Sequence, residues 1–480
     1  MGESSTSNWG TPIQYLLATV CRRWRNLVIN TPLLWALILI SSDTSFDCFK
    51  NFERSQPALV DVSFDSFTSS ADSNLFAQTS DAIAQHIARV RSLKIRVWAS
   101  QEIYTIFESW KNLEAPNLES LEISVSSWAF NSPLTFPSPT FSSASSKKSP
   151  FWRGGKSLRS LKLDGFSYQE FGPLPSLTSL DLDKLNASPQ EFQDILTICP
   201  LLAKLVVRQY GGPSHAPQNL DHIREIDASS LRRLAVKIGD DHYYEECPCA
   251  LPFLSMANLE YLEIINSGAV SDSHFIAISK QWKSLPRLKR LIIRGSSIWE
   301  TDTSFLSCLP RTTTLEVISF PRVAHDALAT ILTLSNLNSL IFDLSGTSAR
   351  CLNAQTFSEV VAKQQIELRC PTIVKLPRSI EIDPTWIDLQ ATLGDRFSVV
   401  KPSEKGSLDD MADYPLLSDG EEDLRDSRHW MLDQDDSVGS DEFREYDDFE
   451  LYDRDEIEYL HEDDFDEDEE DPFEYNHWED

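Results

Sequence analysis

The chain has 480 residues, of which 41% are hydrophobic and 24% are charged, and its formal net charge is −31. This composition allows a large core, and the longest apolar run, residues 33–40, is too short to cross a bilayer, which argues against a membrane-spanning protein. The charge is concentrated at one end, because residues 401–480 carry 34 acidic against 6 basic residues. We therefore expect a nearly neutral folded body followed by a disordered acidic tail over 401–480.

The start of the chain and its cysteines favour a reducing compartment. Residues 1–8 contain neither the basic nor the apolar region of a signal peptide. The eight cysteines lack the regular close spacing of a disulfide framework, and Cys199, for example, takes an apolar position. Cys247 and Cys249 lie near His242, but a zinc site would need a second ligand pair. We expect buried free thiols, no metal, no cofactor, and a cytoplasmic or nuclear protein.

The first predicted element is an amphipathic helix. Apolar residues recur at helical spacing from Leu16 to Val28, with arginines between them. The helix should stop before Pro32, because the residue that precedes a proline disfavours helical backbone. A second short helix is expected to follow, with Thr31 as its cap, Pro32 at its first position and residues 33–35 as its apolar surface.

The amino-acid sequence of this segment resembles that of a known protein family. Residues 20–28, Val-Cys-Arg-Arg-Trp-Arg-Asn-Leu-Val, and residues 30–35, Asn-Thr-Pro-Leu-Leu-Trp, resemble the second half of the F-box-like domains common in mushroom-forming fungi. Residues 53–62, Glu-Arg-Ser-Gln-Pro-Ala-Leu-Val-Asp-Val, look like the linker that joins those domains to leucine-rich repeats. The resemblance covers roughly residues 13–65.

In that family the box docks on the adaptor subunit of a cullin-RING ubiquitin ligase, while the repeats select a substrate. The resemblance thus implies partial F-box-like helices over 13–40 and a linker with the amino-terminal cap of the repeats over 41–89. The family's box opens with a Leu-Pro-x-Glu-like helix further upstream, whereas only twelve residues precede Ile13, so either the box is incomplete or this sequence is truncated at its start. The residues that the resemblance assigns to the box core or the docking face are Val20, Cys21, Trp24, Leu27, Pro32, Leu33 and Trp35.

A short apolar phrase, Leu-x-x-Leu-x-Leu, recurs ten times after this segment, most clearly at residues 259–264. Successive central residues are separated by 28, 40, 19, 25, 29, 28, 29, 24 and 25 positions, mostly within the range of leucine-rich repeats. Each phrase predicts a strand, and one repeat cannot bury its apolar face alone. We therefore expect an α/β fold, a curved leucine-rich-repeat solenoid over 90–400 with a Ser/Pro-rich insertion at 131–150. The central residues are Leu93, Leu121, Leu161, Leu180, Leu205, Leu234, Leu262, Leu291, Leu315 and Leu340.

The polar positions of these strands should form the concave face of the solenoid, where partners usually bind. A group of basic residues is predicted on this face, and it could bind an acidic segment of a substrate or the acidic tail of this chain. The other interpretation is that these are ordinary polar strand positions exposed to solvent. The residues of this group are Lys204, Arg208, Arg233, Lys237, Arg290 and Arg294.

The sequence contains no glycine-rich phosphate loop, no Gly-x-Ser-x-Gly and no His-Glu-x-x-His, so catalytic residues are not expected. With the resemblance, these patterns favour a non-catalytic substrate-recognition subunit of an SCF-type ubiquitin ligase, whose partners are the adaptor and an unknown substrate protein. The alternatives are a ubiquitin-independent scaffold that uses the repeats and the tail, with a basic partner for the tail, and a repeat protein that occludes a basic enzyme. Neither a membrane nor a nucleic acid is expected as a partner.

Overall fold

A computed structural model describes most of residues 13–400, all within one unit that comprises residues 1–423. The predicted tail, the predicted insertion and the residues Cys247, Cys249 and His242 lie outside the described part. The described ranges are 13–41, 45–65, 73–97, 100–110, 113–125, 156–165, 168, 171–186, 189–211, 225–238, 251–266, 285–294, 313–318, 325–334, 337–344, 354–364, 367–376 and 382–400.

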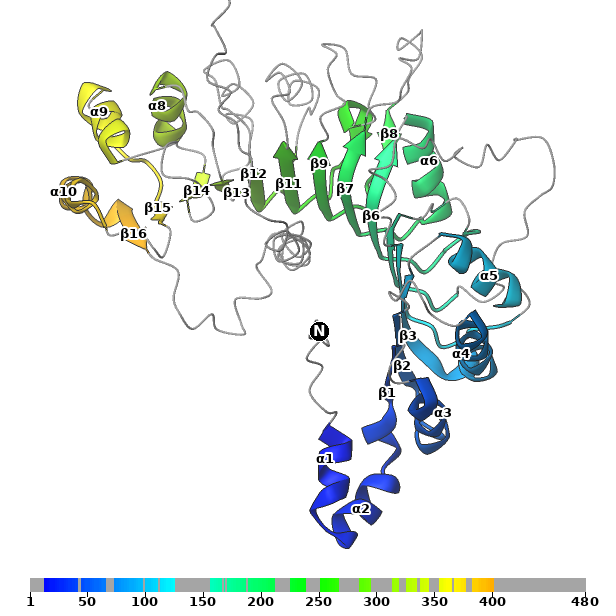
Figure 1. Ribbon diagram of the computed structural model, residues 1–480. Helices are drawn as coiled ribbons and strands as arrows, with labels where there is room; N and C mark the ends of the chain where they lie inside the picture. Colours follow the sequence, from blue (N-terminus) through cyan, green and yellow to red (C-terminus); the bar gives the residue numbers. More distant parts are fainter. Residues whose placement is uncertain are drawn as a thin grey trace, which may run out of the picture. The chain divides into compact units, whose positions relative to one another are not determined.

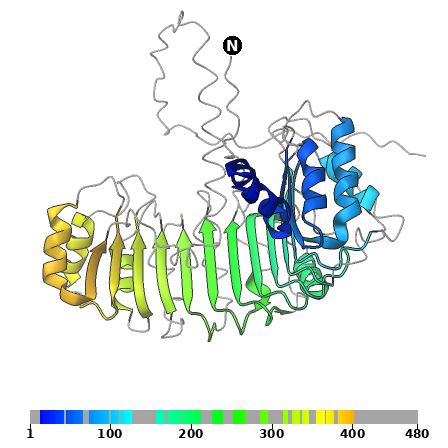
Figure 2. The same cartoon turned by 90° about the horizontal axis from the view of Figure 1, so that it is seen from below.

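The described part is an α/β fold built on one large parallel sheet of 14 strands (Figures 1 and 2). The sheet is open, with β1 at one edge and β16 at the other, and β8 (Ile226–Asp227) and β10 (Leu254–Ser255) form a separate parallel pair. The strands follow chain order: β1 (Leu37–Ile40), β2 (Val60–Asp65), β3 (Val90–Val97), β4 (Ser120–Val125), β5 (Ser160–Asp164), β6 (Ser179–Asn186), β7 (Lys204–Gly211), β9 (Arg233–Ile238), β11 (Tyr261–Asn266), β12 (Arg290–Arg294), β13 (Thr313–Ile318), β14 (Leu337–Asp343), β15 (Thr372–Lys375) and β16 (Phe397–Val400).

Helices connect many of these strands, as a parallel sheet requires. Figure 1 shows α3, α4, α5 and α6 packed along one side of the sheet. The helices are α1 (Ile13–Val20), α2 (Arg22–Ile29), α3 (Ser45–Arg54), α4 (Ser73–His86), α5 (Ser100–Trp110), α6 (Pro189–Ile198), α8 (His325–Thr333), α9 (Ala354–Gln364) and α10 (Pro384–Leu393), with 3-10 turns η1 (Pro32–Trp35), η2 (Ile87–Arg89), η6 (Leu251–Phe253) and η8 (Gly394–Arg396).

All ten predicted phrases are strands, and their central leucines are direct neighbours in the sheet. Leu93 on β3 pairs with Leu121 on β4, and the same register continues strand by strand to Leu340 on β14. These leucines are at most 1% exposed and belong to one continuous core. The recurring spacing in the sequence therefore predicts which strands pair and in what register.

A tight turn precedes several strands and extends the repeated unit beyond the predicted phrase. In each case the backbone N–H of the first leucine donates to the carbonyl three residues earlier, at 3.1–3.2 Å. A proline follows that carbonyl residue, which suits the second position of such a turn. The four turns are Ala115 to Leu118, Leu174 to Leu177, Cys199 to Leu202 and Leu285 to Leu288.

The sheet begins before the first predicted phrase. β1 lies within the segment expected to be helical, and β2 lies within the expected linker, where Val62 pairs with Ile38 on one side and Leu93 on the other. Residues 37–40 are all apolar, so their period does not distinguish a strand from a buried helix. Only Ile38 and Ile40 of this strand are buried, which is the alternation of a strand with one covered face.

Candidate partner-binding surfaces

The amino-terminal segment forms two helices instead of the single helix predicted. Cys21 has extended backbone, with φ −161° and ψ 171°, and separates α1 from α2. The Arg25 side chain donates from Nε to the carbonyl of Ala18 at 3.0 Å, which satisfies a carbonyl in the last turn of α1. The apolar period continues through this break, so periodicity alone could not reveal it.

The predicted second helix is present as the 3-10 turn η1, with Pro32 in its first turn. Thr31 occupies the predicted N-cap position, but its side chain makes no capping bond to η1. Its hydroxyl donates instead to the carbonyl of Leu27 in the last turn of α2, at 2.7 Å. Thr31 therefore ends α2 through its hydroxyl and begins η1 through its carbonyl, which accepts from the backbone N–H of Leu34 at 3.1 Å.

Trp35 holds the two helices against the first strands. It is 1% exposed, and its Nε1 donates to the carbonyl of Val28 at 2.8 Å. The Arg54 guanidinium of α3 lies 4.4 Å above its ring, and Tyr15 packs edge-on at 5.6 Å. The resemblance left open whether Trp35 belongs to the core or to a docking face, and its burial places it in the core.

Most of the other predicted box residues point outward. Leu33 is 75% exposed, Val20 64%, Leu27 56% and Trp24 45%, while Cys21 is also exposed and Pro32 is half-buried. We call the exposed apolar side chains of α1, α2 and η1 the amino-terminal apolar surface; its members are Ile13, Leu16, Val20, Trp24, Leu27, Ile29 and Leu33. Single exposed apolar residues are ordinary, whereas a group on two neighbouring helices is typical of an interaction surface.

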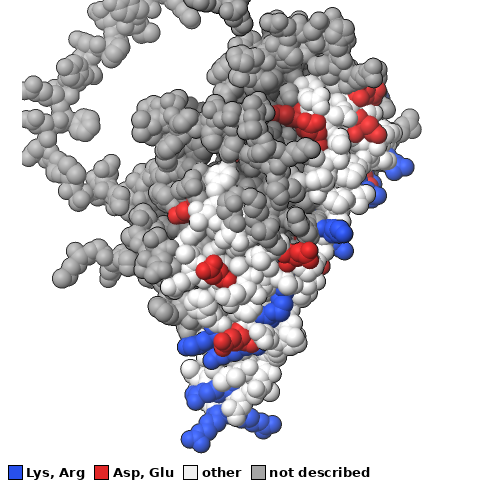
Figure 3. Space-filling model, turned by 90° about the vertical axis from the view of Figure 1, so that its right-hand side faces the viewer, with Lys and Arg blue, Asp and Glu red and all other residues white. Residues whose placement is uncertain are grey.

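Positive charge borders this surface. Arg22, Arg23 and Arg25 of α2 are exposed, and neither α1 nor α2 contains an aspartate or glutamate. Figure 3 shows Lys and Arg side chains gathered at the end of the molecule that carries these helices. A partner here would present an apolar patch with an acidic border.

The second candidate surface lies on the sheet. On strand β4, Leu121 and Ile123 are buried in the core, while the alternate residue Glu122 projects from the opposite side. We call that opposite side of the sheet the polar face. The positions one residue before, one residue after and three residues after each central leucine lie on it, and these are the positions that the sequence predicted for partner binding.

Ion pairs run across neighbouring strands on the first part of the polar face. Nζ of Lys94 on β3 lies 3.1 Å from Oε1 of Glu122 on β4, and Nζ of Lys162 on β5 lies 3.3 Å from the same oxygen. Burial alone would raise the pKa of Glu122, but Lys162 and Lys94 together bring it below its ordinary value. On the next strands, Arg208 forms a two-point contact with Asp181, at 2.9 and 3.1 Å.

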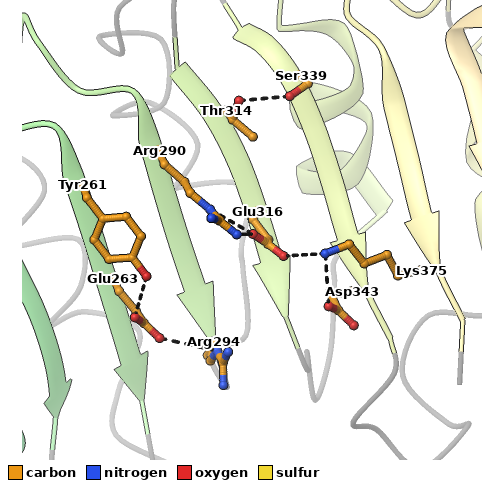
Figure 4. A network of polar contacts seen from close by, with 9 residues as sticks. All are labelled: Tyr261, Glu263, Arg290, Arg294, Thr314, Glu316, Ser339, Asp343 and Lys375. Carbon is orange, nitrogen blue, oxygen red and sulfur yellow. Dashed lines mark hydrogen bonds and ion pairs between the residues drawn. The ribbon is translucent and has the colours of Figure 1, made fainter. Parts of the chain in front are cut away.

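A larger network spans β12 to β15 and centres on Glu316, which is 1% exposed (Figure 4). Arg290 donates to Oε2 of Glu316 at 2.6 Å, and Lys375 donates to Oε1 at 3.0 Å. Lys375 also lies 3.6 Å from Asp343. This network was not predicted from the sequence, although Glu316 directly follows the predicted central residue Leu315 and so had a predictable place beside Arg290.

Fully buried Glu263 anchors a second group of polar side chains shown in Figure 4. The Tyr261 hydroxyl donates to Oε2 of Glu263 at 2.7 Å, and Nε of Arg294 lies 3.7 Å from Oε1. A buried carboxylate requires such partners, because its charge is costly away from water. Glu263 therefore joins β11 to β12 rather than offering a free charge to a partner.

The six predicted basic residues fall into two groups. Arg208, Arg290 and Arg294 are engaged in the ion pairs above. Within the described part of the chain, the remaining three form no hydrogen bond or ion pair, and they lie on the adjacent strands β7 and β9. These three are Lys204, Arg233 and Lys237.

Two carboxylates lie close together beside this region. Burial, and then the negative charge of Asp183, raise the pKa of Asp164 to about 6, while Lys162 and Arg208 act in the opposite direction. Asp164 also bonds with Ser124 of the neighbouring strand. At neutral pH the side chain is therefore mostly ionised, and Lys162 and Arg208 favour this charged form.

No family model matches this chain. A search of curated proteins gives no match either. In the ranges that the structure describes, no group of three or more His, Cys, Asp and Glu residues is arranged to hold a metal ion. None of the helices described is long and apolar enough to span a membrane.

Proposed function

We propose that this protein is a non-catalytic substrate receptor of an SCF-type cullin-RING ubiquitin ligase. The amino-terminal apolar surface would dock on the adaptor subunit, and the polar face of the sheet would select a substrate protein. The observation that carries the proposal is the contrast between Trp35, which is buried and fixes the helices, and the exposed apolar residues that those helices present. This contrast supports the docking role that the family resemblance implies.

The energetics of the amino-terminal apolar surface favour a protein partner. Each large apolar side chain that becomes buried contributes about 1.5–3 kcal/mol. Trp24 and Leu27 lie on one short helix whose position is fixed through Val28 and Trp35. Binding would therefore cost little conformational entropy of the backbone. Tryptophan and arginine are also the residues most often found at the energetic centres of interfaces.

We further propose that the parallel sheet is part of a curved leucine-rich-repeat solenoid, with the polar face on its concave side. The in-register column of ten central leucines and the recurrent turn before the strands support this architecture. In such a solenoid each unit packs only on its neighbours, and the polar strand positions form one extended surface.

Co-purification with the adaptor of a mushroom-forming fungus tests the adaptor role. The full chain should retain the adaptor, and Trp24→Ala with Leu27→Ala should weaken binding about tenfold or more, because two central apolar contacts are lost. The matched control is Leu201→Ala with Ile387→Ala, since these residues are 59% and 58% exposed and lie outside α1, α2 and η1.

The proposal requires the control variant to bind like the unchanged chain. Equal binding by all three proteins would show that the adaptor contacts another surface. If none of them binds, the protein is not a receptor of this class, and a ubiquitin-independent scaffold becomes the better account.

A further inference from the structure

Charge compensation across strands is the rule on the polar face. Glu122 forms ion pairs with two lysines, Asp181 with Arg208, and Glu316 with Arg290 and Lys375. Each pair joins side chains from neighbouring or next-neighbouring strands, which offsets the cost of placing charges on a sheet.

Strands β7 and β9 depart from this rule. Lys204 on β7 and Arg233 on β9 are direct register partners, so two basic residues stand side by side on backbones at the roughly 4.8 Å spacing of paired strands. Lys237 lies four residues further along β9, about 13 Å from Arg233 in an extended strand. Like charges directly opposite each other destabilise a sheet, and within the described residues no carboxylate forms an ion pair with any of the three.

Acidic side chains border these cations on both sides. Asp181 and Asp183 lie on β6, and the buried Glu263 lies on β11. The positive charge is therefore confined to a stripe of two strands, and the fully buried apolar residues Val206 and Ala235 lie between its two ends. A nucleic acid carries a phosphate about every 3.4 Å along each strand and would place several of them against the bordering carboxylates. A peptide in extended form is narrow enough to follow the stripe.

We infer that Lys204, Arg233 and Lys237 bind an extended acidic segment of the substrate protein. One carboxylate would lie between Lys204 and Arg233, and a second, four residues along the segment, would contact Lys237. The inference rests on the proposed function, because it names the class of segment that the receptor selects. It also explains why Lys204 and Lys237 form no ion pair, and why Arg233 has only a weak electrostatic contact with the partly exposed Glu260, on a face where charges are otherwise paired.

The test uses the full chain and a fluorescein-labelled Ser/Gly peptide of about ten residues, which carries two glutamate pairs four residues apart. Fluorescence anisotropy at low salt should detect binding, and a peptide with glutamine in place of glutamate should bind at least about tenfold more weakly. High salt should remove the difference, since exposed charges are screened beyond about 3 Å at 1 M.

The decisive variant is Lys204→Gln with Arg233→Gln and Lys237→Gln, which should weaken binding of the acidic peptide about tenfold. The matched control, Lys156→Gln with Arg159→Gln and Lys363→Gln, removes the same residue types and the same charge from exposed positions elsewhere. It should change the affinity less than about twofold. Equal losses in the two variants would indicate a general charge effect, and this result or the absence of binding would overturn the inference.

A thermal melt provides a second readout. Removing adjacent like charges should leave the melting temperature of the Lys204, Arg233 and Lys237 variant unchanged or slightly raised. A clear decrease would mean that these cations stabilise the fold, which contradicts a role reserved for a ligand. The peptide assay contains no adaptor, so its outcome is independent of adaptor binding through Trp24 and Leu27.

Discussion

Replacing Trp35 with alanine tests whether one side chain holds the helical segment against the sheet. Trp35 is 1% exposed, so the substitution opens a cavity and removes the bond from Nε1 to the carbonyl of Val28. Such a change in a core costs about 3–5 kcal/mol. Because each element of this fold packs mainly on its neighbours, we expect the loss to fall on α1, α2 and η1 rather than on the distant strands.

Hydrogen–deuterium exchange read by mass spectrometry checks this expectation. A loss of about 4 kcal/mol corresponds to faster exchange of residues 13–35 by up to about a thousandfold, with little change in β11 to β14. Trp35→Phe is the control, because it keeps an aromatic ring in the core and, although it loses the indole hydrogen bond and some volume, it removes much less buried surface than alanine does. Unchanged exchange of residues 13–35 in the alanine variant would refute the anchoring role of Trp35.

Three further predictions concern the polar face and the core. Glu316→Ala leaves Arg290 without its buried partner and should lower the free energy of unfolding by about 3 kcal/mol in denaturant titrations, whereas a loss below about 1 kcal/mol would show that the network is dispensable. The folded-state pKa of Asp164 is raised to about 6, above its unfolded value, so its protonated form favours folding and this contribution is lost as pH rises through 6. Asp164→Asn should therefore raise the melting temperature more at pH 7.5 than at pH 4.5, and an equal effect at both values would exclude the linkage. Burial raises the pKa of Cys199 to about 12, so peptide mapping after iodoacetamide treatment at pH 8 should find Cys21 alkylated and Cys199 unmodified, and equal modification would contradict the burial.

The strand order could be predicted from the sequence because each repeat has a leucine at the same position of its strand, and this leucine defines the register. Leu262 and Leu291 are 29 residues apart, and both occupy the same position in consecutive strands. The outermost strands lack this leucine. β16, for example, has Phe397 at the position that leucine takes elsewhere, and β15 has Thr372. The repeat pattern therefore predicts the centre of the sheet more completely than its ends.

The candidate surfaces were harder to predict, because they depend on which charges meet in space. Lys204 and Arg290 are both basic, but their neighbours differ. Arg290 lies beside the carboxylate of Glu316, whereas Lys204 lies beside Arg233. The family resemblance likewise groups Leu27 and Trp35 together, although one is exposed and the other buried. Packing against α3, which comes later in the chain, decides that difference.

The measurement that most directly tests the account is hydrogen–deuterium exchange of the full chain with and without the ligase adaptor. We predict slower exchange of α1 and α2 in the presence of the adaptor, since their exposed apolar side chains would become buried. The strands of the polar face should be unaffected, because the substrate is absent. Unchanged exchange of residues 13–35 at saturating adaptor would contradict the central claim, and so would protection confined to the strands.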